Sequence, residues 1–533
     1  MEFSWLGRVE IRGALQFEMG KQPLGFDVPV GMRKPKAIVI GAGVSGLAVS
    51  IRLAAKGYEV CVIEGSETVG GKIAQHEDSG FRFDRGPSLF TMPELMEELD
   101  ALVPLDLPGR PRPFKYSKLD RSTHYFWEDE KGPLIAWSDS KRFASEIDSR
   151  WGVPAEKTLK HLRLSKDIFE LTRGVFLEKS LHKFKTYWSK ELRRLLVNLW
   201  KVPLLGTMSQ FNARRLMHPK LEQVFNRYAT YNGSDPHRAP AMLHAIPHLE
   251  HGIGAFLPLA GMRAIPEHLE QLARAIGVEI RTGSAVQKIL HRNGKISGVL
   301  DASGSEHFAE VVVSNADVHL TYQHLLKDVP SPKRIVQQER STSGLSFYWG
   351  VKGTHPELGL HNILFSKDYR SEFEMLSGGS KPGSDPTVYI NITSKEISSD
   401  APENCENWFI LVNVAAEPEY WTETAIEEAR EVVLAKITRT LGFRPDIQCE
   451  QVLTPRTIEA TTGSWKGALY GASSNSVSAA FFRHRNQSKD VDGLFFCGGS
   501  VHPGGGIPLC LMGAKIVDGL VEIPAESVRL RAS

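Results

Sequence analysis

Cysteine is scarce in this sequence, and the spacing that would bind a structural metal is missing. The 533 residues include five cysteines, an odd number without a CxxC pair, at Cys61, Cys405, Cys449, Cys497 and Cys510. Neither a disulfide framework nor a zinc site is therefore expected, and no metal is predicted. The cysteine usage fits a reducing compartment, so we expect a cytoplasmic protein.

Long apolar runs and an excess of one charge are also missing. The longest apolar stretch, around Gly252–Met262, falls short of the ~20 residues needed to cross a bilayer. Lys and Arg number 64 against 62 Asp and Glu, a net charge of +2, which indicates no nucleic-acid partner. Hydrophobic residues at 41% and charged residues at 24% exclude a disordered or collagen-like chain. We expect a globular protein that is soluble or lies on a membrane surface.

The first 31 residues lack the continuous apolar core of a signal peptide, because charged residues interrupt them. The basic segment that starts at Met32 leads directly into an apolar run. We therefore predict an unstructured extension over residues 1–31, and a short tail over residues 526–533.

A strand, a glycine turn, a helix, a second strand and an acid follow one another near the start of the chain. They are Ala37–Ile40, the GxGxxG segment Gly41–Gly46, Leu47–Lys56, Tyr58–Ile63 and Glu64. Such a turn lets a pyrophosphate approach the backbone and the helix N-terminus, while the acid accepts hydrogen bonds from ribose hydroxyls. The order of these elements predicts a dinucleotide site; the alternative is an ordinary glycine turn.

A second group of glycines follows Glu64, at a place where an NAD-binding fold would simply continue into its next helix. It consists of Gly70-Gly71-Lys72 and, after Arg85, of Gly86-Pro87-Ser88. A further close backbone approach suits a longer dinucleotide, FAD, that lies extended through the protein. The alternative is a mobile surface loop.

A similar arrangement stands near the other end of the chain. The strand at residues 493–496 leads through Gly498 and Gly499 to Gly506 and Ile507, where a helix is predicted over Leu509–Val521. A second helix N-terminus can stabilise negative charge at the other end of the cofactor. A glycine-rich turn without a ligand is the alternative.

The middle of the chain has a different pattern, with helices predicted between Phe143 and Phe211. Seven basic residues and one acid, Glu191, lie between Lys179 and Lys201. On one helix, five apolar side chains would share a face: Trp188, Leu192, Leu195, Leu196 and Leu199. This pattern is typical of a helix that docks on a membrane surface, or of one whose apolar face packs in the core.

Taken together, the motifs resemble those of the bacterial-type, phytoene desaturase-like carotenoid desaturases, within the amine oxidase superfamily. The segments that carry the resemblance are Gly41–Gly46, Glu64, Gly70–Lys72, Asp84–Ser88, Arg227–Gly233, Gly261-Met262, Ser314–Asp317 and Gly498–Pro508. Segments Gly86–Pro93 and Glu406–Phe409 are most similar to the 1-hydroxycarotenoid 3,4-desaturases of Bacteroidetes. Arg85 stands where the family usually has a small residue.

The resemblance implies an α/β fold, in which a Rossmann-like FAD-binding domain is interleaved with a mixed α+β substrate domain. The FAD-binding domain is predicted over 32–105, 251–330 and 450–525, and the substrate domain over 106–250 and 331–449. The implied cofactor-binding residues are Gly41, Gly43, Val44, Ser45, Gly46, Glu64, Gly70, Gly71, Lys72, Gly86, Pro87, Ser88, Val286, Gly498, Gly499, Gly506 and Ile507.

The implied reaction is desaturation of an acyclic carotenoid. Flavin takes a hydride from one carbon, the polyene delocalises the resulting cation, and the neighbouring proton then needs only a weak base. His502 is a weak candidate for that base, and Arg227 and Glu250 are weaker ones. The implied partners are a C40-type polyene and the inner face of the cell membrane, where the protein would be bound peripherally.

Other functions stay open at this point. A phytoene desaturase of the same family is the alternative within the group. More remote alternatives are a flavin oxidase for amines or porphyrinogens and a flavin-less carrier of prenyl lipids. An intact glycine turn together with Glu64 argues against the carrier, which would not need both.

Overall fold

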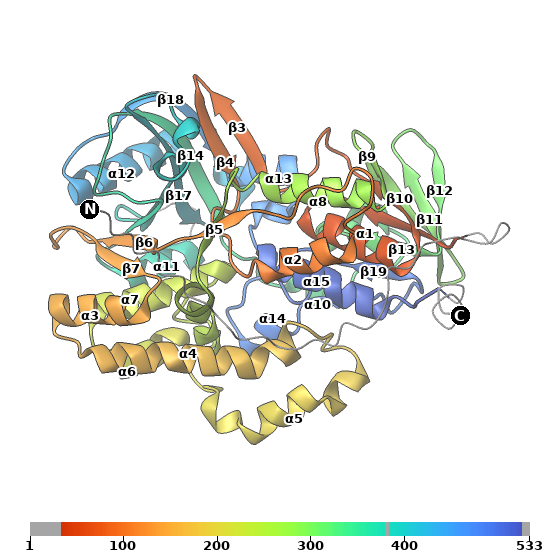
Figure 1. The fold of residues 1–533 in the computed structure, drawn as a ribbon, viewed down its shortest axis with the longest axis horizontal. Helices are drawn as coiled ribbons and strands as arrows, with labels where there is room; N and C mark the ends of the chain where they lie inside the picture. Colours follow the sequence, from red (N-terminus) through yellow and green to blue (C-terminus); the bar gives the residue numbers. More distant parts are fainter. Residues whose placement is uncertain (1–33, 379–382, 525–533) are drawn as a thin grey trace, which may run out of the picture. The chain divides into compact units, whose positions relative to one another are not determined.

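The computed structural model describes residues 34–378 and 383–524. The chain divides into the units Met1–Lys34 and Pro35–Ser533, and everything below concerns the second of these (Figure 1). The predicted extension over residues 1–31 and the predicted tail over residues 526–533 lie outside the described residues.

A five-stranded parallel sheet with the order β19-β13-β1-β2-β9 carries the first motif. Its strands are β1 (Lys36–Ile40), β2 (Glu59–Ile63), β9 (Glu279–Arg281), β13 (Val311–Ser314) and β19 (Leu494–Phe496). Because side chains alternate along a strand, Ala37 and Val39 of β1 belong to one core cluster, and Ile38 and Ile40 to another. The apolar runs are therefore buried on both faces, as the sequence predicts.

Helices cover one face of this sheet and a small antiparallel sheet lies against the other. The helices are α1 (Val44–Lys56), α2 (Glu94–Leu102), α8 (Ala264–Ala275) and α15 (Ile507–Leu520), which share a core with Ala37 and Val39. The small sheet consists of β10 (Val286–Arg292), β11 (Lys295–Asp301) and β12 (Glu306–Phe308). Its Ile289 and Val299 pack with Ile38.

A seven-stranded sheet forms the second layer, with the order β18-β14-β17-β16-β15-β6-β7. Its strands are β6 (Arg121–Phe126), β7 (Leu134–Trp137), β14 (Ser343–Lys352), β15 (His361–Leu364), β16 (Val388–Ile392), β17 (Cys405–Val414) and β18 (Asp446–Leu453). Helix α12 (Glu423–Leu441) packs on one face, in a core that contains Phe347 and Ile410. Two antiparallel pairs of strands remain: the hairpin of β3 (Ala74–Asp78) and β4 (Phe81–Arg85), and the long-range pair of β5 (Tyr116–Lys118) and β8 (Phe256–Pro258).

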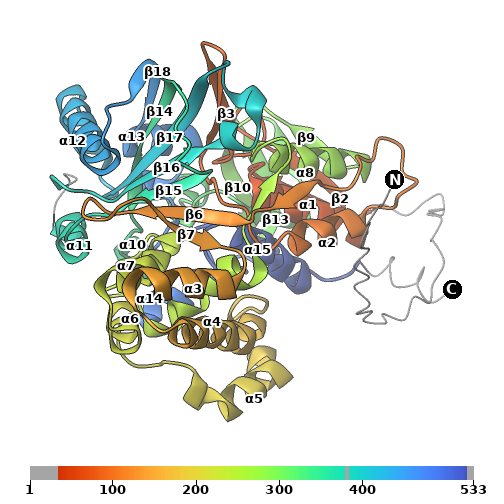
Figure 2. The ribbon, with the colours of Figure 1, turned by 60° about the vertical axis from the view of Figure 1, so that its left-hand side comes forward.

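The remaining helices gather mostly on the lower side of the unit in Figures 1 and 2. They are α3 (Ser140–Trp151), α4 (Ala155–Phe176), α5 (Lys190–Val197), α6 (Met208–Leu216), α7 (Pro219–Asn226), α9 (Val318–Leu320), α10 (Lys333–Gln337), α11 (Tyr369–Gly378), α13 (Pro455–Thr462) and α14 (Val477–Phe481). Short 3-10 and π-helical turns are η1 (Phe184–Trp188), η2 (Leu199–Lys201), η3 (Arg227–Asn232), η4 (Ala241–Ala245), η5 (Leu249–Ile253), η6 (Thr321–Leu325), η7 (Thr393–Lys395), η8 (Ser398–Asp400), η9 (Pro418–Tyr420) and η10 (Trp465–Gly467).

The predicted amphipathic helix around Lys179–Lys201 is wrong as a single element. The structure divides it into η1, α5 and η2. Ser189 has an extended backbone and caps α5 by accepting a hydrogen bond from the Leu192 amide at 3.2 Å, a typical N-cap arrangement. Trp188 therefore lies outside α5 and is 66% exposed, whereas Leu195 is buried. In both views α5 lies at the outer edge, beyond α4 (Figure 2).

The predicted domain boundaries stay a prediction. The strands of the parallel sheet all lie in the segments assigned to the cofactor domain, and those of the seven-stranded sheet in the segments assigned to the substrate domain, except β18. β18 crosses the boundary predicted at residue 450. Within the described part of the chain, no helix is both long and apolar enough to cross a bilayer.

Candidate cofactor and substrate site

A single cavity of about 960 Å³ connects the parallel sheet with the seven-stranded sheet. This volume is near the upper end of the ~300–1,000 Å³ typical of ligand sites. The segments that follow β1, β2, β13 and β19 line one part of it. Ligands of open parallel sheets bind at this edge, outside the carboxyl ends of the strands.

The first glycine turn faces the cavity at the N-terminus of α1. Gly41, Gly43, Val44 and Ser45 line the cavity, whereas Gly46 does not. A Cβ atom on Gly46 would lie 2.1 Å from the carbonyl oxygen of Gly41, so this glycine permits close packing of the helix on the strand. No side chain caps α1 at Gly43, which leaves its first N–H groups available to an anion.

Glu64 lies at the end of β2 and lines the cavity. Its carboxylate accepts hydrogen bonds from the Ala42 amide at 2.6 Å and from the Ser66 amide at 2.9 Å. Because a carboxylate has about four acceptor positions, it can still accept hydrogen bonds from a ligand. Val286, the first residue of β10, lines the same part of the cavity.

The second glycine segment lies directly on the first one. Gly70 forms an isolated bridge with Gly43, and its amide donates to the Ala42 carbonyl at 2.9 Å. Gly70, Gly71 and Lys72 line the cavity. The Lys72 ammonium donates to the Leu469 carbonyl at 2.7 Å. Burial lowers the pKa of Lys72 to about 8, and an anion bound nearby would raise it again.

Gly86, Pro87 and Ser88 line the cavity just after β4. Gly86 has φ +101°, and a Cβ atom there would lie 2.0 Å from the Lys72 carbonyl oxygen. No other residue fits this close crossing of two segments without a shift of the backbone. Arg85 also lines the cavity, and Tyr348 of β14 does so from the facing sheet. Burial raises the pKa of Tyr348 to about 12, although Arg85 opposes this rise.

The C-terminal glycines bring a second helix N-terminus to the cavity. Gly498, Gly499, Gly506 and Ile507 line it, and α15 begins at Ile507 without a side-chain cap. A Cβ atom on Gly506 would meet nothing within 4 Å, so this turn borders open space. Two uncapped helix N-termini thus face one cavity, as the sequence predicts.

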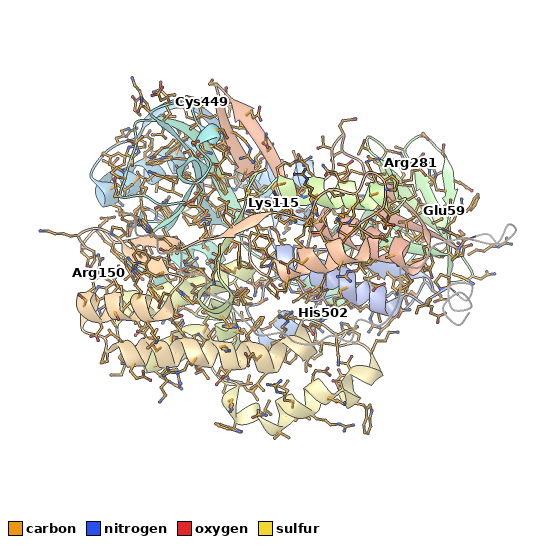
Figure 3. All side chains as sticks on the ribbon, in the orientation of Figure 1. Glu59, Lys115, Arg150, Arg281, Cys449 and His502 are labelled. Carbon is orange, nitrogen blue, oxygen red and sulfur yellow. The ribbon has the colours of Figure 1, made fainter. Side chains whose placement is uncertain are left out.

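His502 is not among the residues that line the cavity. It is a buried residue of the segment that precedes α15 (labelled in Figure 3), and its Nε2 lies 3.0 Å from the Lys179 carbonyl, just beyond the end of α4. Burial lowers its pKa to about 4, so the ring is neutral at pH 7 and Nε2 donates to that carbonyl. The geometry gives His502 a structural position, and its role as a base gains no support.

Asn315 is a residue of the cradle that the predicted site omits. It follows β13, lines the cavity and donates from Nδ2 to the Gly41 carbonyl at 3.4 Å. A Cβ atom on Gly43 would lie 2.9 Å from its Nδ2, and a Cβ atom on Gly498 would lie 2.8 Å from its Oδ1. One side chain thus lies in close contact with both glycine turns. Its place directly after a predicted buried strand, within Ser314–Asp317, is the signal that would have found it.

The other part of the cavity is mostly apolar. It lies against the face of the seven-stranded sheet opposite α12, and against the helices α4, α14 and the turns η4 and η5. Its apolar lining includes Phe169, Phe176, Met242, Ile246, Leu249, Ile363, Leu411 and Phe481. This part of the cavity suits a hydrocarbon chain.

A buried ion pair borders this apolar part. Nη2 of Arg227 lies 3.2 Å from Oε2 of Glu250, and donates to the Tyr125 hydroxyl at 2.7 Å. The Tyr231 hydroxyl donates to Glu250 at 2.8 Å. Burial opposes ionisation, but the Arg227 guanidinium and these hydrogen bonds hold the pKa of Glu250 at about 2. Arg227 and Tyr231 line the cavity, so the sequence motif that contains them does belong to the site.

These groups fit a long dinucleotide. Partners for phosphate and ribose groups lie along one wall: two helix N-termini without a side-chain cap, the carboxylate of Glu64 and the ammonium of Lys72. The space beyond them continues into the apolar part. The fold and the site together define a flavin-dependent oxidoreductase, whose cofactor is FAD.

Comparison with known proteins identifies the family. The chain belongs to the family described as flavin containing amine oxidoreductase, whose model matches residues 44–517. It is 46% identical over 492 residues to a 1-hydroxycarotenoid 3,4-desaturase of Flavobacterium sp., covering 91% of this chain and 99% of that protein. It is 30% identical over 496 residues to a hydroxyneurosporene desaturase of Rubrivivax gelatinosus, covering 91% and 93%.

Among solved structures, an oxidoreductase from Methanosarcina mazei matches with a TM-score of 0.59 at 16% identity, covering 90% of this chain and 98% of that chain. At this identity the likeness shows the fold alone. The predicted fold, the FAD cofactor and the resemblance to carotenoid desaturases are confirmed. Which residues contact FAD stays a prediction, now with positions in one cavity.

Proposed function

We propose that this protein is a 1-hydroxycarotenoid 3,4-desaturase, an enzyme that introduces a double bond next to the polyene of an acyclic, 1-hydroxylated carotenoid. One observation carries the proposal: the cradle for FAD and a mostly apolar compartment are parts of the same cavity. A polyene can therefore lie in the apolar part while its end group reaches the cofactor. The similarity to two desaturases of hydroxylated carotenoids supports the same substrate class.

The reaction removes a hydride from one carbon and a proton from its neighbour, and the remaining electron pair forms the new C=C bond. Bound FAD supplies the acceptor for the hydride. The apolar walls, among them Phe169 and Leu249, exclude water from the reacting end and hold the polyene in line. Conjugation with the polyene stabilises the developing cation, so a long chromophore is a better substrate than phytoene.

The chain needs no strong base for this reaction, and Glu250 is not one. Its pKa of about 2, set against burial by Arg227 and by hydrogen bonds from Tyr231 and Ser122, makes it a poor proton acceptor at neutral pH. Arg227 and Glu250 instead both stay charged and form a permanent ion pair at the cavity wall. A weak base or water suffices for a proton next to a delocalised cation.

We further infer that the protein takes its substrate from the inner face of the cell membrane, to which it binds peripherally. Seven apolar side chains are exposed on and around α5: Tyr187, Trp188, Leu196, Val197, Trp200, Leu204 and Leu205. Exposed Lys190, Arg193 and Arg194 lie among them. Aromatic and basic residues together are typical of surfaces that bind anionic lipid.

This surface is connected to the cavity through a small core. Leu195 of α5 belongs to a cluster with Leu171 and Val175 of α4, against which Phe176 and Phe481 pack. Phe176 and Phe481 also line the cavity. A hydrocarbon that enters beside α5 would therefore contact apolar side chains along its whole path to the cofactor cradle.

The substrate proposal is tested with the FAD-loaded protein in liposomes that contain a quinone as electron acceptor. Three compounds are offered separately: a 1-hydroxylated acyclic carotenoid, its deoxy analogue and phytoene. We expect the hydroxylated compound to gain one double bond, with a loss of two mass units and a red shift of its absorbance maximum. Conversion of phytoene in four steps, without preference for the hydroxylated compound, would instead establish the phytoene desaturase alternative.

A further inference from the structure

A buried imidazole in the cavity has a hydrogen-bonding group to spare. His361, the first residue of β15, is 3% exposed and lines the cavity together with Ile363, two residues further on the same face of the strand. Its Nδ1 has hydrogen-bond partners on the neighbouring strand β16. Its Nε2 is buried and has no hydrogen-bond partner among the described residues.

The neighbours of Nδ1 determine which nitrogen carries the proton. The Asn391 amide nitrogen lies 3.0 Å from the Leu360 carbonyl, which only accepts, and 3.2 Å from Nδ1 of His361. Nδ1 is therefore an acceptor. Burial lowers the pKa of His361 to about 4, so the ring is neutral at pH 7 and its one proton is on Nε2. The spare group is an N–H donor.

A chain of hydroxyls connects this ring with the cofactor cradle. The Tyr389 hydroxyl lies 2.7 Å from Nδ1 of His361, and the Ser88 hydroxyl lies 2.6 Å from that of Tyr389. Since Nδ1 accepts, Tyr389 donates to it and in turn accepts from Ser88. Ser88 belongs to the segment 86–88 that the sequence predicts to contact FAD. Tyr389 is thus a positioning residue that orients the imidazole.

We propose that Nε2–H of His361 donates a hydrogen bond to the 1-hydroxyl of the substrate and so selects hydroxylated carotenoid ends. This inference rests on the proposed function, because the hydroxyl-bearing carbon must lie close to the cofactor. In a 3,4-desaturation that carbon is only two bonds from the nearer reacting carbon. A group that binds it has to lie beside the cradle, and the chain from Ser88 places His361 there.

The chemistry of the subsite favours a neutral oxygen. A hydrocarbon end cannot accept a hydrogen bond, and it would leave the buried N–H unsatisfied, which disfavours the deoxy substrate. A neutral imidazole offers no charge to attract an anion. Sites built to bond a substrate hydroxyl discriminate strongly against the analogue that lacks it.

The test compares the FAD-loaded wild type with His361→Phe, His361→Met and His361→Gln in liposomes. Each enzyme is offered the 1-hydroxylated carotenoid and its deoxy analogue, and the ratio of their kcat/KM values is measured. Binding of both compounds to previously reduced enzyme, which cannot turn over, is followed by the polyene absorbance. The matched control is His124→Phe on the neighbouring strand β6, since His124 is also buried with a free Nε2 but does not line the cavity.

We expect His361→Phe and His361→Met to lower the preference about 10- to 100-fold, largely through improved use of the deoxy analogue. His361→Gln keeps a donor at the same reach and should retain most of the preference, as should His124→Phe. Flavin content and melting temperature establish that each variant is folded. A preference that survives in both donor-less variants overturns the subsite while the proposed function stands. A wild type without any preference overturns the proposed function, and the subsite with it.

Discussion

Glu64 connects two segments of the cofactor cradle, because its carboxylate accepts hydrogen bonds from the amides of Ala42 and Ser66. The residue also lines the cavity. Replacing it with alanine removes a charged acceptor for the ribose of FAD. Each charge-assisted hydrogen bond is worth ~1.5–3 kcal/mol, so we expect Glu64→Ala to bind FAD about 10- to 100-fold more weakly. Flavin retained after gel filtration and the quenching of flavin fluorescence measure this loss.

The control for Glu64 is a glutamate on the same strand. Glu59 (labelled in Figure 3) is exposed, pairs with Lys36 at 3.0 Å and is not among the residues that line the cavity. Glu59→Ala should bind FAD like the wild type. Equal flavin loss in the two variants would mean that Glu64 has no specific role in the cradle.

The Arg227–Glu250 pair allows a second prediction at the scale of single residues. Arg227→Leu leaves a buried carboxylate without its cation, which costs about 3–5 kcal/mol of unfolding free energy. Adding Glu250→Gln removes the second charge and should restore most of the loss. Urea unfolding of the single and double variants measures both effects.

An exposed pair shows what the same change does in solvent. Arg238 and Glu339 form a bidentate pair at the surface. Arg238→Leu should therefore lower the free energy of unfolding by no more than about 1 kcal/mol. If the double variant at Arg227 and Glu250 were as unstable as the single one, burial of the charge would not explain the loss.

At the scale of elements, α5 carries the inferred membrane surface. The variant Lys190→Glu/Arg193→Glu/Arg194→Glu reverses three exposed charges without touching the buried Leu195. Basic residues near anionic lipid contribute ~1 kcal/mol each, so we expect at least 10-fold weaker binding to anionic liposomes with unchanged flavin content. Sedimentation with liposomes at low and high salt measures the binding, which should weaken with salt in the wild type.

The matched control changes the net charge equally on another surface. Arg292, Lys295 and Lys327 are exposed around the β10–β11 hairpin and after η6. Arg292→Glu/Lys295→Glu/Lys327→Glu should leave liposome binding close to that of the wild type. Equal sedimentation of the α5 variant and the wild type would make α5 a merely solvated helix.

At the scale of the whole molecule, buried imidazoles make stability depend on pH. Burial lowers the pKa of His244, His251, His361 and His502 to about 4, and that of His484 to about 3. In the unfolded chain their pKa is ~6.5. Between pH 6.5 and 4 the unfolded chain therefore binds more protons, and the free energy of unfolding falls as the pH is lowered through this window.

The size of this fall in the free energy of unfolding depends on the number of protons that the unfolded chain takes up. Each imidazole contributes at most ~1.4 kcal/mol per pH unit. We expect the urea midpoint, followed by tryptophan fluorescence, to be clearly lower at pH 5 than at pH 7. A midpoint that stays constant between these values would show that these rings bind protons equally in the folded and the unfolded chain.

The sequence by itself was enough to predict the cofactor cradle. Each glycine turn stands between a buried strand and a helix that are adjacent in the chain, so the geometry of Gly41–Gly46 and of Gly498–Ile507 depends on short-range order. Glu64 follows from the same local pattern. The cysteines and the net charge likewise needed no structure for their interpretation.

Only the tertiary structure decided which distant groups meet in the cavity. Ser88, His361 and Tyr389 come from separate segments and form one hydrogen-bonded chain, and Glu250 becomes a buried partner of Arg227. The division at Ser189 was readable as a helix cap, but the burial of Leu195 beside exposed Leu196 depends on α4. Such contacts depend on how strands and helices pack, and sequence periodicity carries no information about which faces finally meet.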